Sequence, residues 1–175
     1  FYQMWYEKEG AAMKKYAIDL DITKCISCGA CSIACMDQND IDTEKGIRPF
    51  RAVFDWEKRG CGGNAEYVHI SIACMHCTDA PCVTACPCAC IRKDTETGLT
   101  IYDNTSCIGC HSCAMACPFG IPAFNEEGRM QKCDGCAVRV RHGLEPACVK
   151  VCPSRALHLV HTGEVEGMDA SRSLE

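Results

Sequence analysis

Sixteen cysteines gathered in four dense groups constrain this chain more than any other feature of its sequence. The chain has 175 residues, of which 19 are cysteine. The first and third groups share one spacing, every group ends with an x3 step, and a proline follows the last three groups. The groups are Cys25-x2-Cys28-x2-Cys31-x3-Cys35, Cys74-x2-Cys77-x4-Cys82-x3-Cys86, Cys107-x2-Cys110-x2-Cys113-x3-Cys117 and Cys133-x2-Cys136-x11-Cys148-x3-Cys152.

This spacing is that of the bacterial ferredoxin run, which binds 4Fe-4S clusters. Three thiolates from one tight loop can wrap one cubane, while the cysteine after the x3 step lies on the following helix and serves a second cluster. Gly29 and Gly109 give the loops the backbone freedom to fold around sulfur. Sixteen ligands are enough for four clusters. The spacing requires that groups exchange their last cysteines in pairs, but it leaves two pairings open. In nested pairing the first group pairs with the fourth and the second with the third, and in tandem pairing the first pairs with the second and the third with the fourth.

Two other uses of cysteine are less consistent with this pattern. A disulfide framework scatters its cysteines to tie distant loops together, whereas these cysteines are dense and their total is odd. A structural zinc site uses separated pairs of cysteines and would not recur four times with a final x3 step and proline. A structural zinc-binding module is therefore a distant alternative.

Short alternating segments precede and follow the cysteine groups and predict strands. We expect strands at Tyr16–Ile22, Val68–Ile72 and Ala156–Val160, and a β-hairpin in which Ile91–Asp94 and Leu99–Tyr102 flank a turn with Gly98. The x3 steps predict short helices, because they place two ligands about one helical turn apart. These helices are Ser32–Asp37, Ala114–Cys117 and Ala147–Val151.

The order of strand, cluster loop, helix and strand repeats along the chain, which predicts an α+β fold with two units like the two-cluster bacterial ferredoxins. Residues 36–73 and 118–132 are expected to be insertions, residues 1–12 an N-terminal extension or tag, and residues 162–175 a C-terminal tail. No stretch approaches the roughly 20 apolar residues of a membrane helix, and the N-terminus has no apolar signal-peptide core. We therefore expect a soluble chain.

Four stretches of the sequence resemble the four-cluster iron-sulfur subunits of molybdopterin oxidoreductases, the dimethyl-sulfoxide-reductase β-subunit type, over residues 14 to 161. They are ITKCISCGACSIAC, CMHCTDAPCVTACP, CIGCHSCAMACPFGIPAFN and GRMQKCDGCAVRVRHGLEPACVKVCPSRALH. The resemblance implies nesting: residues 74–117 form an inner ferredoxin-like unit, and residues 13–73 and 118–161 an outer one.

The resemblance also implies four ligand sets, each binding one 4Fe-4S cluster. They are set A (Cys25, Cys28, Cys31, Cys152), set B (Cys133, Cys136, Cys148, Cys35), set C (Cys74, Cys77, Cys82, Cys117) and set D (Cys107, Cys110, Cys113, Cys86). All sixteen positions are cysteine, which favours four cubanes over a 3Fe cluster.

Five further residues near the groups could take part in cluster binding, but we interpret each of them as an ordinary structural or solvated residue. Relatives usually read CPTGA where this chain reads Cys86-Pro87-Cys88-Ala89-Cys90, and we interpret Cys88 and Cys90 as small buried apolar residues. Cys61, alone in a glycine turn, is interpreted as an incidental thiol. His76 and His111 lie inside cluster loops and are interpreted as solvated rather than as ligands.

The formal net charge of −5 counts each cysteine as neutral. Four oxidised cubanes with their thiolates add two negative charges each, which takes the chain to about −13 and makes nucleic acid an improbable partner. Basic residues near the groups are expected to offset cluster charge. They are Lys24, Lys132, Arg139, Arg141, Lys150 and Arg155.

No catalytic triad, phosphate-binding glycine loop or paired-carboxylate motif is present, and every cluster has a full ligand set. We therefore expect a non-catalytic electron-transfer subunit. The resemblance implies that it links a molybdopterin catalytic subunit, with molybdenum or tungsten, to a membrane anchor, a quinone-reactive partner or a soluble carrier. The alternative is a polyferredoxin of a hydrogenase or formate-hydrogenlyase complex. Its location is either cytoplasmic or, after folded export with a partner bearing a twin-arginine signal, at the cytoplasmic membrane.

Overall fold

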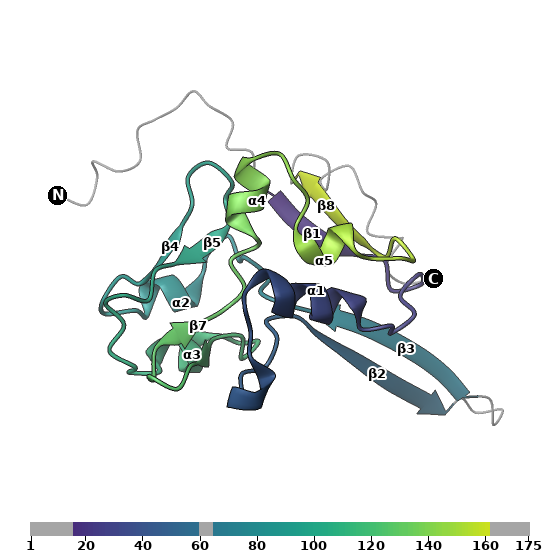
Figure 1. Cartoon of the computed structure of the whole chain (residues 1–175), viewed down its shortest axis with the longest axis horizontal. Helices are drawn as coiled ribbons and strands as arrows, with labels where there is room; N and C mark the ends of the chain where they lie inside the picture. Colours follow the sequence, from purple (N-terminus) through teal and green to yellow (C-terminus); the bar gives the residue numbers. More distant parts are fainter. Residues whose placement is uncertain (1–15, 60–64, 162–175) are drawn as a thin grey trace.

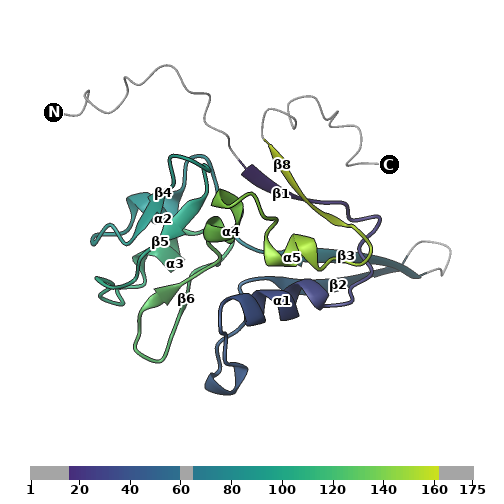
Figure 2. The same ribbon diagram turned by 45° about the horizontal axis from the view of Figure 1, so that its top comes forward.

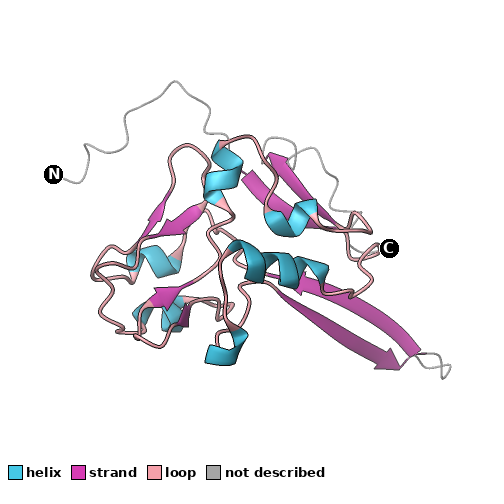
Figure 3. Ribbon diagram, viewed as in Figure 1, coloured by secondary structure: helices cyan, strands magenta, loops and turns pink. Residues whose placement is uncertain are grey.

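The protein is a small mixed α and β structure in which short elements are joined by long loops, as Figure 3 shows. The computed structural model describes residues 16–59 and 65–161. The helices are α1 (Ala30–Gln38), η1 (a 3-10 helix, Thr43–Lys45), α2 (Pro81–Thr84), α3 (Ser112–Ala116), α4 (Ala137–Arg141) and α5 (Ala147–Lys150). The strands are β1 (Tyr16–Leu20), β2 (Ala52–Arg59), β3 (Ala65–Ile72), β4 (Ile91–Lys93), β5 (Thr100–Tyr102), β6 (Ala123–Phe124), β7 (Met130–Gln131) and β8 (Leu157–His161). In these residues no helix is both long enough and apolar enough to cross a bilayer.

The first and last described strands are paired to each other. β1 and β8 run antiparallel, with Tyr16 opposite His161 and Leu20 opposite Leu157. Helices α1 and α5 also pack together, and their side of the molecule is visible in Figure 1. A small core of Cys31, Cys148, Val149 and Leu157 lies between these elements. The pairing therefore brings the first cysteine group beside the fourth.

The middle of the chain forms a second cluster of elements, on the other side of the molecule in Figure 2. This cluster consists of the β4–β5 hairpin, helices α2 and α3, and the β6–β7 hairpin. Its core contains Cys82, Ile91, Cys113 and Met130. Helix α4 links the two sides, because its Ala137 and Val140 pack with Leu99 and Ile101 of the β4–β5 region.

Several elements that the sequence predicts are present with small shifts. The expected strands correspond to β1, β3, β4, β5 and β8, and the expected helices to α1, α3 and α5. The final strand begins at Leu157 rather than Ala156, and Gly98 of the hairpin turn has a φ of 70°. The predicted extension at residues 1–12, the tail at residues 162–175 and Cys61 lie outside the described residues.

Residues 36–73, interpreted from the sequence only as an insertion, contain the longest strands of the described chain. Strands β2 and β3 pair from Ala52 and Ile72 to Arg59 and Ala65, and this hairpin extends from the rest of the molecule in Figure 1. Strand β2 was not predicted from the sequence. Its aromatic side chains Phe54 and Trp56 are exposed, so no buried face imposes an alternation of apolar and polar residues. Elements α2, α4, β6 and β7 were also not predicted; each has five or fewer residues.

The four cysteine loops share a backbone feature that reveals the repeat more clearly than the spacing does. The residue directly before the second cysteine of each group has a left-handed backbone. These residues are Ser27, His76, Gly109 and Gly135, with φ of 56°, 46°, 66° and 74°. At Gly109 a side chain is also excluded by space, because an added Cβ would lie 2.7 Å from the carbonyl oxygen of Gly128.

We predict that Gly109→Ala destabilises the protein more than Gly29→Ala does. Both glycines have positive φ, which costs another residue about 1–2 kcal/mol, but an added Cβ at Gly29 meets nothing within 4 Å. The clash at Gly109 should therefore lower the thermal unfolding midpoint by several further degrees. Circular dichroism on oxygen-free protein measures both midpoints. Equal midpoints would contradict the close approach of the Gly109 and Gly128 backbones.

Candidate metal centres

Three cavities in the structure are each lined by four cysteines of the groups, three from one group and one from another, and one of the three cavities is lined by two further cysteines as well. Each cavity contains the cysteines of one implied ligand set. Set A lines a cavity with Cys25, Cys28, Cys31 and Cys152. Set B lines another with Cys35, Cys133, Cys136 and Cys148. Set D lines a third with Cys86, Cys107, Cys110 and Cys113.

The cysteines of set C also lie near one another. Burial raises the pKa of the Cys82 thiol, and the nearby thiols of Cys74 and Cys117 raise it further. Cys77 packs against the small core that contains Cys82. Members of the second and third cysteine groups thus approach each other through helices α2 and α3, which are in contact.

The four sets consist of cysteine alone, which suits an iron-sulfur group. Among the described residues, no three His, Cys, Asp or Glu side chains are placed to hold one metal ion. A 4Fe-4S cubane carries iron at four alternate corners, each bound to one thiolate, and therefore holds its four thiolates farther apart than one tetrahedral ion does. Cysteine thiolates are the ligands that such clusters use.

Two of the turns that follow a group's last cysteine are built alike and direct an N–H at sulfur. The backbone N–H of Cys90 donates to Cys86 Sγ, and that of Ala156 donates to Cys152 Sγ, each at 3.3 Å. In both turns the preceding residue, Ala89 or Arg155, has positive φ. Such N–H···S bonds stabilise negative charge on a thiolate ligand.

The first group has no proline after its last cysteine, and helix α1 continues beyond Cys35. Its terminal asparagine supplies the donor instead, because Asn39 Nδ2 lies 3.7 Å from Cys35 Sγ. The same amide donates to the Cys35 carbonyl oxygen at 2.7 Å. A side chain here replaces the backbone donor found in the turns after Cys86 and Cys152.

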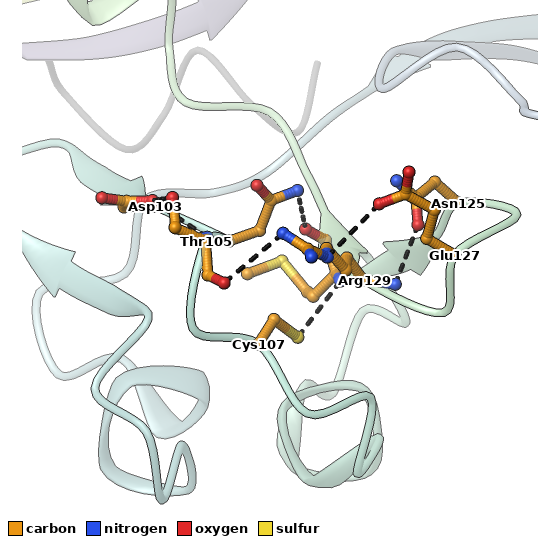
Figure 4. A network of polar contacts seen from close by, with 8 residues as sticks. Asp103, Thr105, Cys107, Asn125, Glu127 and Arg129 are labelled. Atoms are coloured by element: carbon orange, nitrogen blue, oxygen red, sulfur yellow. Dashed lines mark hydrogen bonds and ion pairs between the residues drawn. The ribbon is translucent and has the colours of Figure 1, made fainter.

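The third loop is held by the β6–β7 hairpin (Figure 4). The backbone N–H of Met130 donates to Cys107 Sγ at 3.3 Å, and Asn104 Nδ2 donates to the Met130 carbonyl oxygen at 3.1 Å. Arg129 donates to the Thr105 carbonyl oxygen at 3.4 Å. The hairpin therefore fixes the position of the Cys107 sulfur.

Arg51 is a buried cation at the cavity of set B, and it was not predicted from the sequence. Its side chain is 4% exposed and lines the cavity. The guanidinium donates through Nη1 to the carbonyl oxygen and hydroxyl of Ser71, at 3.2 and 3.0 Å. Its Nε is buried and has no hydrogen-bond partner among the described residues. A cluster at set B would offer this donor an acceptor in its sulfur atoms, so the residues present fit that group.

Lys132 is a second buried cation and lies between sets B and C. The residue is 1% exposed, and its Nζ donates to the carbonyl oxygens of Thr100 and, at 2.8 Å, Cys133. It also lies 4.0 Å from Cys74 Sγ. No carboxylate of the described residues forms an ion pair with it. A buried cation is costly unless an anion compensates it, and a thiolate-bound cluster supplies that charge.

The interpretation of His76 as a solvated loop residue is wrong. The backbone N–H of Thr100 donates to His76 Nδ1 at 3.0 Å, so the ring proton of the neutral form resides on Nε2. That nitrogen lies 3.8 Å from Cys133 Sγ and donates to it. Desolvation is the main cause that lowers the pKa of His76 to about 3, and repulsion from Lys132 is the second. A neutral His76 thus connects the loop of set C to a sulfur of set B. His111, by contrast, is exposed and stacks on Phe124 with ring centroids 3.7 Å apart.

The cysteines predicted to be ligands include several that burial keeps protonated when no metal is bound. Burial raises the pKa of Cys133 to about 12 and those of Cys113 and Cys136 to about 11. Metal ligands must be thiolates, and metal binding therefore releases these protons. Iron bound at these cysteines would supply the positive charge that makes buried thiolates favourable.

The extra thiols Cys88 and Cys90 both line the cavity of set D. Cys90 is 4% exposed, and burial together with the charge of Cys86 raises the pKa of its thiol to about 11. Cys88 is partly buried. The expected burial is thus confirmed for Cys90, whereas Cys88 is only partly buried.

Most basic residues identified near the groups are engaged elsewhere. Lys24 pairs with Asp21 at 2.7 Å, and Arg141 pairs with Asp94 at 2.8 Å. Lys150 is exposed and pairs with Glu145 at 3.7 Å. Arg139 donates to the Glu145 carbonyl oxygen, and Arg155 occupies the left-handed position of its turn. Of these six residues, Lys132 is the one whose side chain approaches a cysteine sulfur within the described ranges.

Comparison with known proteins agrees with these observations. Residues 65–162, more than half of the chain, match the family described as 4Fe-4S dicluster domain. The protein is 40% identical over 148 residues to the B subunit of the anaerobic dimethyl sulfoxide reductase of Escherichia coli K12, covering 82% of this chain and 72% of that one. It is 36% identical over 162 residues to the corresponding subunit of Haemophilus influenzae, covering 87% and 77%.

A second kind of relative is the iron-sulfur subunit of the nitrate-inducible formate dehydrogenase of Escherichia coli K12. Identity there is 37% over 152 residues, covering 79% of this chain and 52% of that one. The resemblance inferred from the four motifs is thus confirmed. The protein belongs to the 4Fe-4S dicluster family, as a non-catalytic electron-transfer subunit of the kind found in dimethyl sulfoxide reductases and formate dehydrogenases.

Proposed function

We propose that the protein carries four 4Fe-4S clusters, one at each of sets A to D. It relays electrons between a molybdopterin catalytic subunit, with molybdenum or tungsten, and a membrane anchor, a quinone-reactive partner or a soluble carrier. The observation that carries this proposal is the convergence of cysteines from two groups on each of three cavities. The relatives named as subunits of anaerobic dimethyl sulfoxide reductase and formate dehydrogenase support the class of partner.

The elements support nested pairing rather than tandem pairing. The β1–β8 ladder and the contact of α1 with α5 join the first cysteine group to the fourth. The contact of α2 with α3 joins the second group to the third. We therefore propose residues 74–117 as the inner ferredoxin-like unit and residues 13–73 with 118–161 as the outer one. The β6–β7 hairpin belongs to the outer range in sequence but packs Met130 into the inner core.

The contacts between sets support one row of clusters in the order A, B, C, D. Sets A and B exchange their last cysteines, as do sets C and D. The two pairs meet where Lys132 reaches both Cys74 of set C and the Cys133 carbonyl oxygen of set B. When bound, each cluster accepts and returns one electron. The protein's own residues hold the clusters at fixed separations and shield the inner ones from water.

The ends of the row are the places where partners can approach. Cys28 of set A and Cys110 of set D are exposed, whereas every cysteine described in sets B and C is buried or partly buried. A large apolar side chain lies in the same loop as each exposed cysteine. These side chains are Ile26, which is 60% exposed, and Ile108, which is 68% exposed. Exposed apolar side chains next to a redox centre suit a docking surface. We infer that the catalytic subunit and the second partner dock at opposite ends of the row.

Metal analysis of the native complex, purified without oxygen from its host, tests the proposed function. We expect at least sixteen irons per copy of this chain, together with molybdenum or tungsten from the copurified partner. Nickel without either metal would assign the protein to a hydrogenase assembly. Abundant zinc with little iron would contradict the proposed electron-transfer function.

Ligand variants distinguish nested from tandem pairing. In the nested arrangement Cys117 binds the same cluster as Cys77, whereas in a tandem arrangement it binds the same cluster as Cys136. We expect Cys117→Ser and Cys77→Ser to alter the same electron paramagnetic resonance signal of the reduced protein. A shared change between Cys117→Ser and Cys136→Ser would contradict nesting.

Removal of the Cys90 thiol should leave the iron content intact. The Cys90→Ala variant keeps the backbone N–H that donates to Cys86 Sγ and loses only a buried sulfur, at a cost of about 1–2 kcal/mol. We expect wild-type iron per chain and a slightly lower thermal midpoint. The matched control, Cys113→Ala in the same cavity, should lose iron. Loss of about four irons from Cys90→Ala would instead identify Cys90 as a ligand.

A further inference from the structure

The cavities of the cysteine sets differ in the charges around them. Among residues 16–59 and 65–161, no lysine or arginine lines the cavity of set A or that of set D. The cavity of set B is lined by Arg51, which is almost completely buried. These two kinds of environment will act differently on a bound cluster, because a buried charge is screened far less than an exposed one.

Two buried cations and one neutral donor lie at set B, on the side of Cys133 and the cavity wall formed by Arg51. The buried Nε of Arg51 lies at this cavity and has no hydrogen-bond partner in the described ranges. Lys132 donates to the carbonyl oxygen of Cys133, and its charge acts on the Cys133 sulfur. His76 directs Nε2–H at the same sulfur, with its tautomer fixed by the N–H of Thr100.

One acidic residue opposes these groups. Asp134 lines the cavity of set B, and its carboxylate accepts the backbone N–H of Cys136 at 2.8 Å. Asp134 is partly exposed, whereas Arg51 and Lys132 are 4% and 1% exposed. Solvent screens the carboxylate more than it screens the two cations, so the balance of charge at set B is positive.

A positive surrounding favours the reduced form of a cluster. Reduction adds one electron and therefore one negative charge, which cations and N–H donors near the sulfurs stabilise. Hydrogen bonds to sulfur, net charge and exposure are the quantities that set cluster potentials. Exposed Cys28 and Cys110 place sets A and D nearer water, and no cation of the described part of the chain lines their cavities.

We propose that Arg51, Lys132 and His76 poise the cluster of set B at a more positive potential than the clusters of sets A and D. The proposal rests on the four-cluster function argued above. In the transfer it implies, the cluster at one end of the row loses one electron and the cluster at set B gains it, with no bond or proton changing place. The cluster of set B is then the one that is reduced first when a single electron enters the row. The positioning residues for this cluster are Arg51, Lys132 and His76.

A redox titration of the intact complex, followed by electron paramagnetic resonance, tests the proposal. The signal of set B is identified by its change in Cys136→Ser. We expect Arg51→Met, Lys132→Met and His76→Leu each to lower the reduced-to-oxidised ratio of this cluster about tenfold at a fixed potential, a shift of about 59 mV for one electron. The signal of set D should keep its midpoint in all three variants, and that of set A should keep it in Lys132→Met and His76→Leu. In Arg51→Met the midpoint of set A should shift less than that of set B, because the Ser71 hydroxyl lies between Arg51 and Cys31 Sγ.

Two further variants guard against a general loss of structure. Asp134→Asn keeps an oxygen that accepts the Cys136 N–H and removes the opposing charge, so the midpoint of set B should shift to more positive potential. Lys150→Met removes an exposed cation on α5, two residues from Cys148, and should leave all midpoints unchanged.

The outcomes separate this inference from the proposed function. Iron-poor protein without cluster signals would overturn both. Four clusters with set B at or below the midpoints of sets A and D would overturn the inference alone. So would unchanged midpoints in Lys132→Met and Asp134→Asn, whether or not the Arg51 variant folds.

Discussion

Cysteines that are far apart in the sequence converge on shared cavities, and the rest of the fold depends on that convergence. Cys152 can reach the cavity of Cys25, Cys28 and Cys31 because β8 pairs with β1. The apolar cores are small and contain cysteines themselves, so they could not hold so many loops by hydrophobic burial alone. In the proposed account, bonds from thiolate to iron supply the missing cohesion, as metal binding does in other small metalloproteins.

The same convergence creates an electrostatic problem that the fold answers with buried cations. Thiolates crowd together with raised pKa values, and neighbouring thiols raise them further, as at Cys82 and Cys133. Lys132 and Arg51 lie within this region without a carboxylate partner in the described residues. Their burial is costly in an apo protein and favourable beside anionic clusters. The two cations thus connect the packing of the fold to the potential of its redox centres.

The sequence alone was sufficient to identify the cysteine groups and to predict much of the local structure. Spacing identified the groups, and alternation identified β1, β3, β4, β5 and β8. It could not reveal β2, whose Phe54 and Trp56 face outward. Nor could it reveal the role of His76, because the donor that fixes its tautomer, Thr100, lies 24 residues away. Arg51 was missed for a similar reason: its burial against Ser71 depends on the β2–β3 hairpin.

The central claim is that four clusters lie in one row with nested ligand sets. Anomalous diffraction at the iron absorption edge, from crystals of the complex grown without oxygen, tests it most directly. The account predicts four separate four-iron peaks in this protein, ordered A, B, C, D, with Cys152 bonded to the first and Cys117 to the third. Fewer than four peaks, or Cys117 bonded to the cluster of Cys133, Cys136 and Cys148, would contradict it.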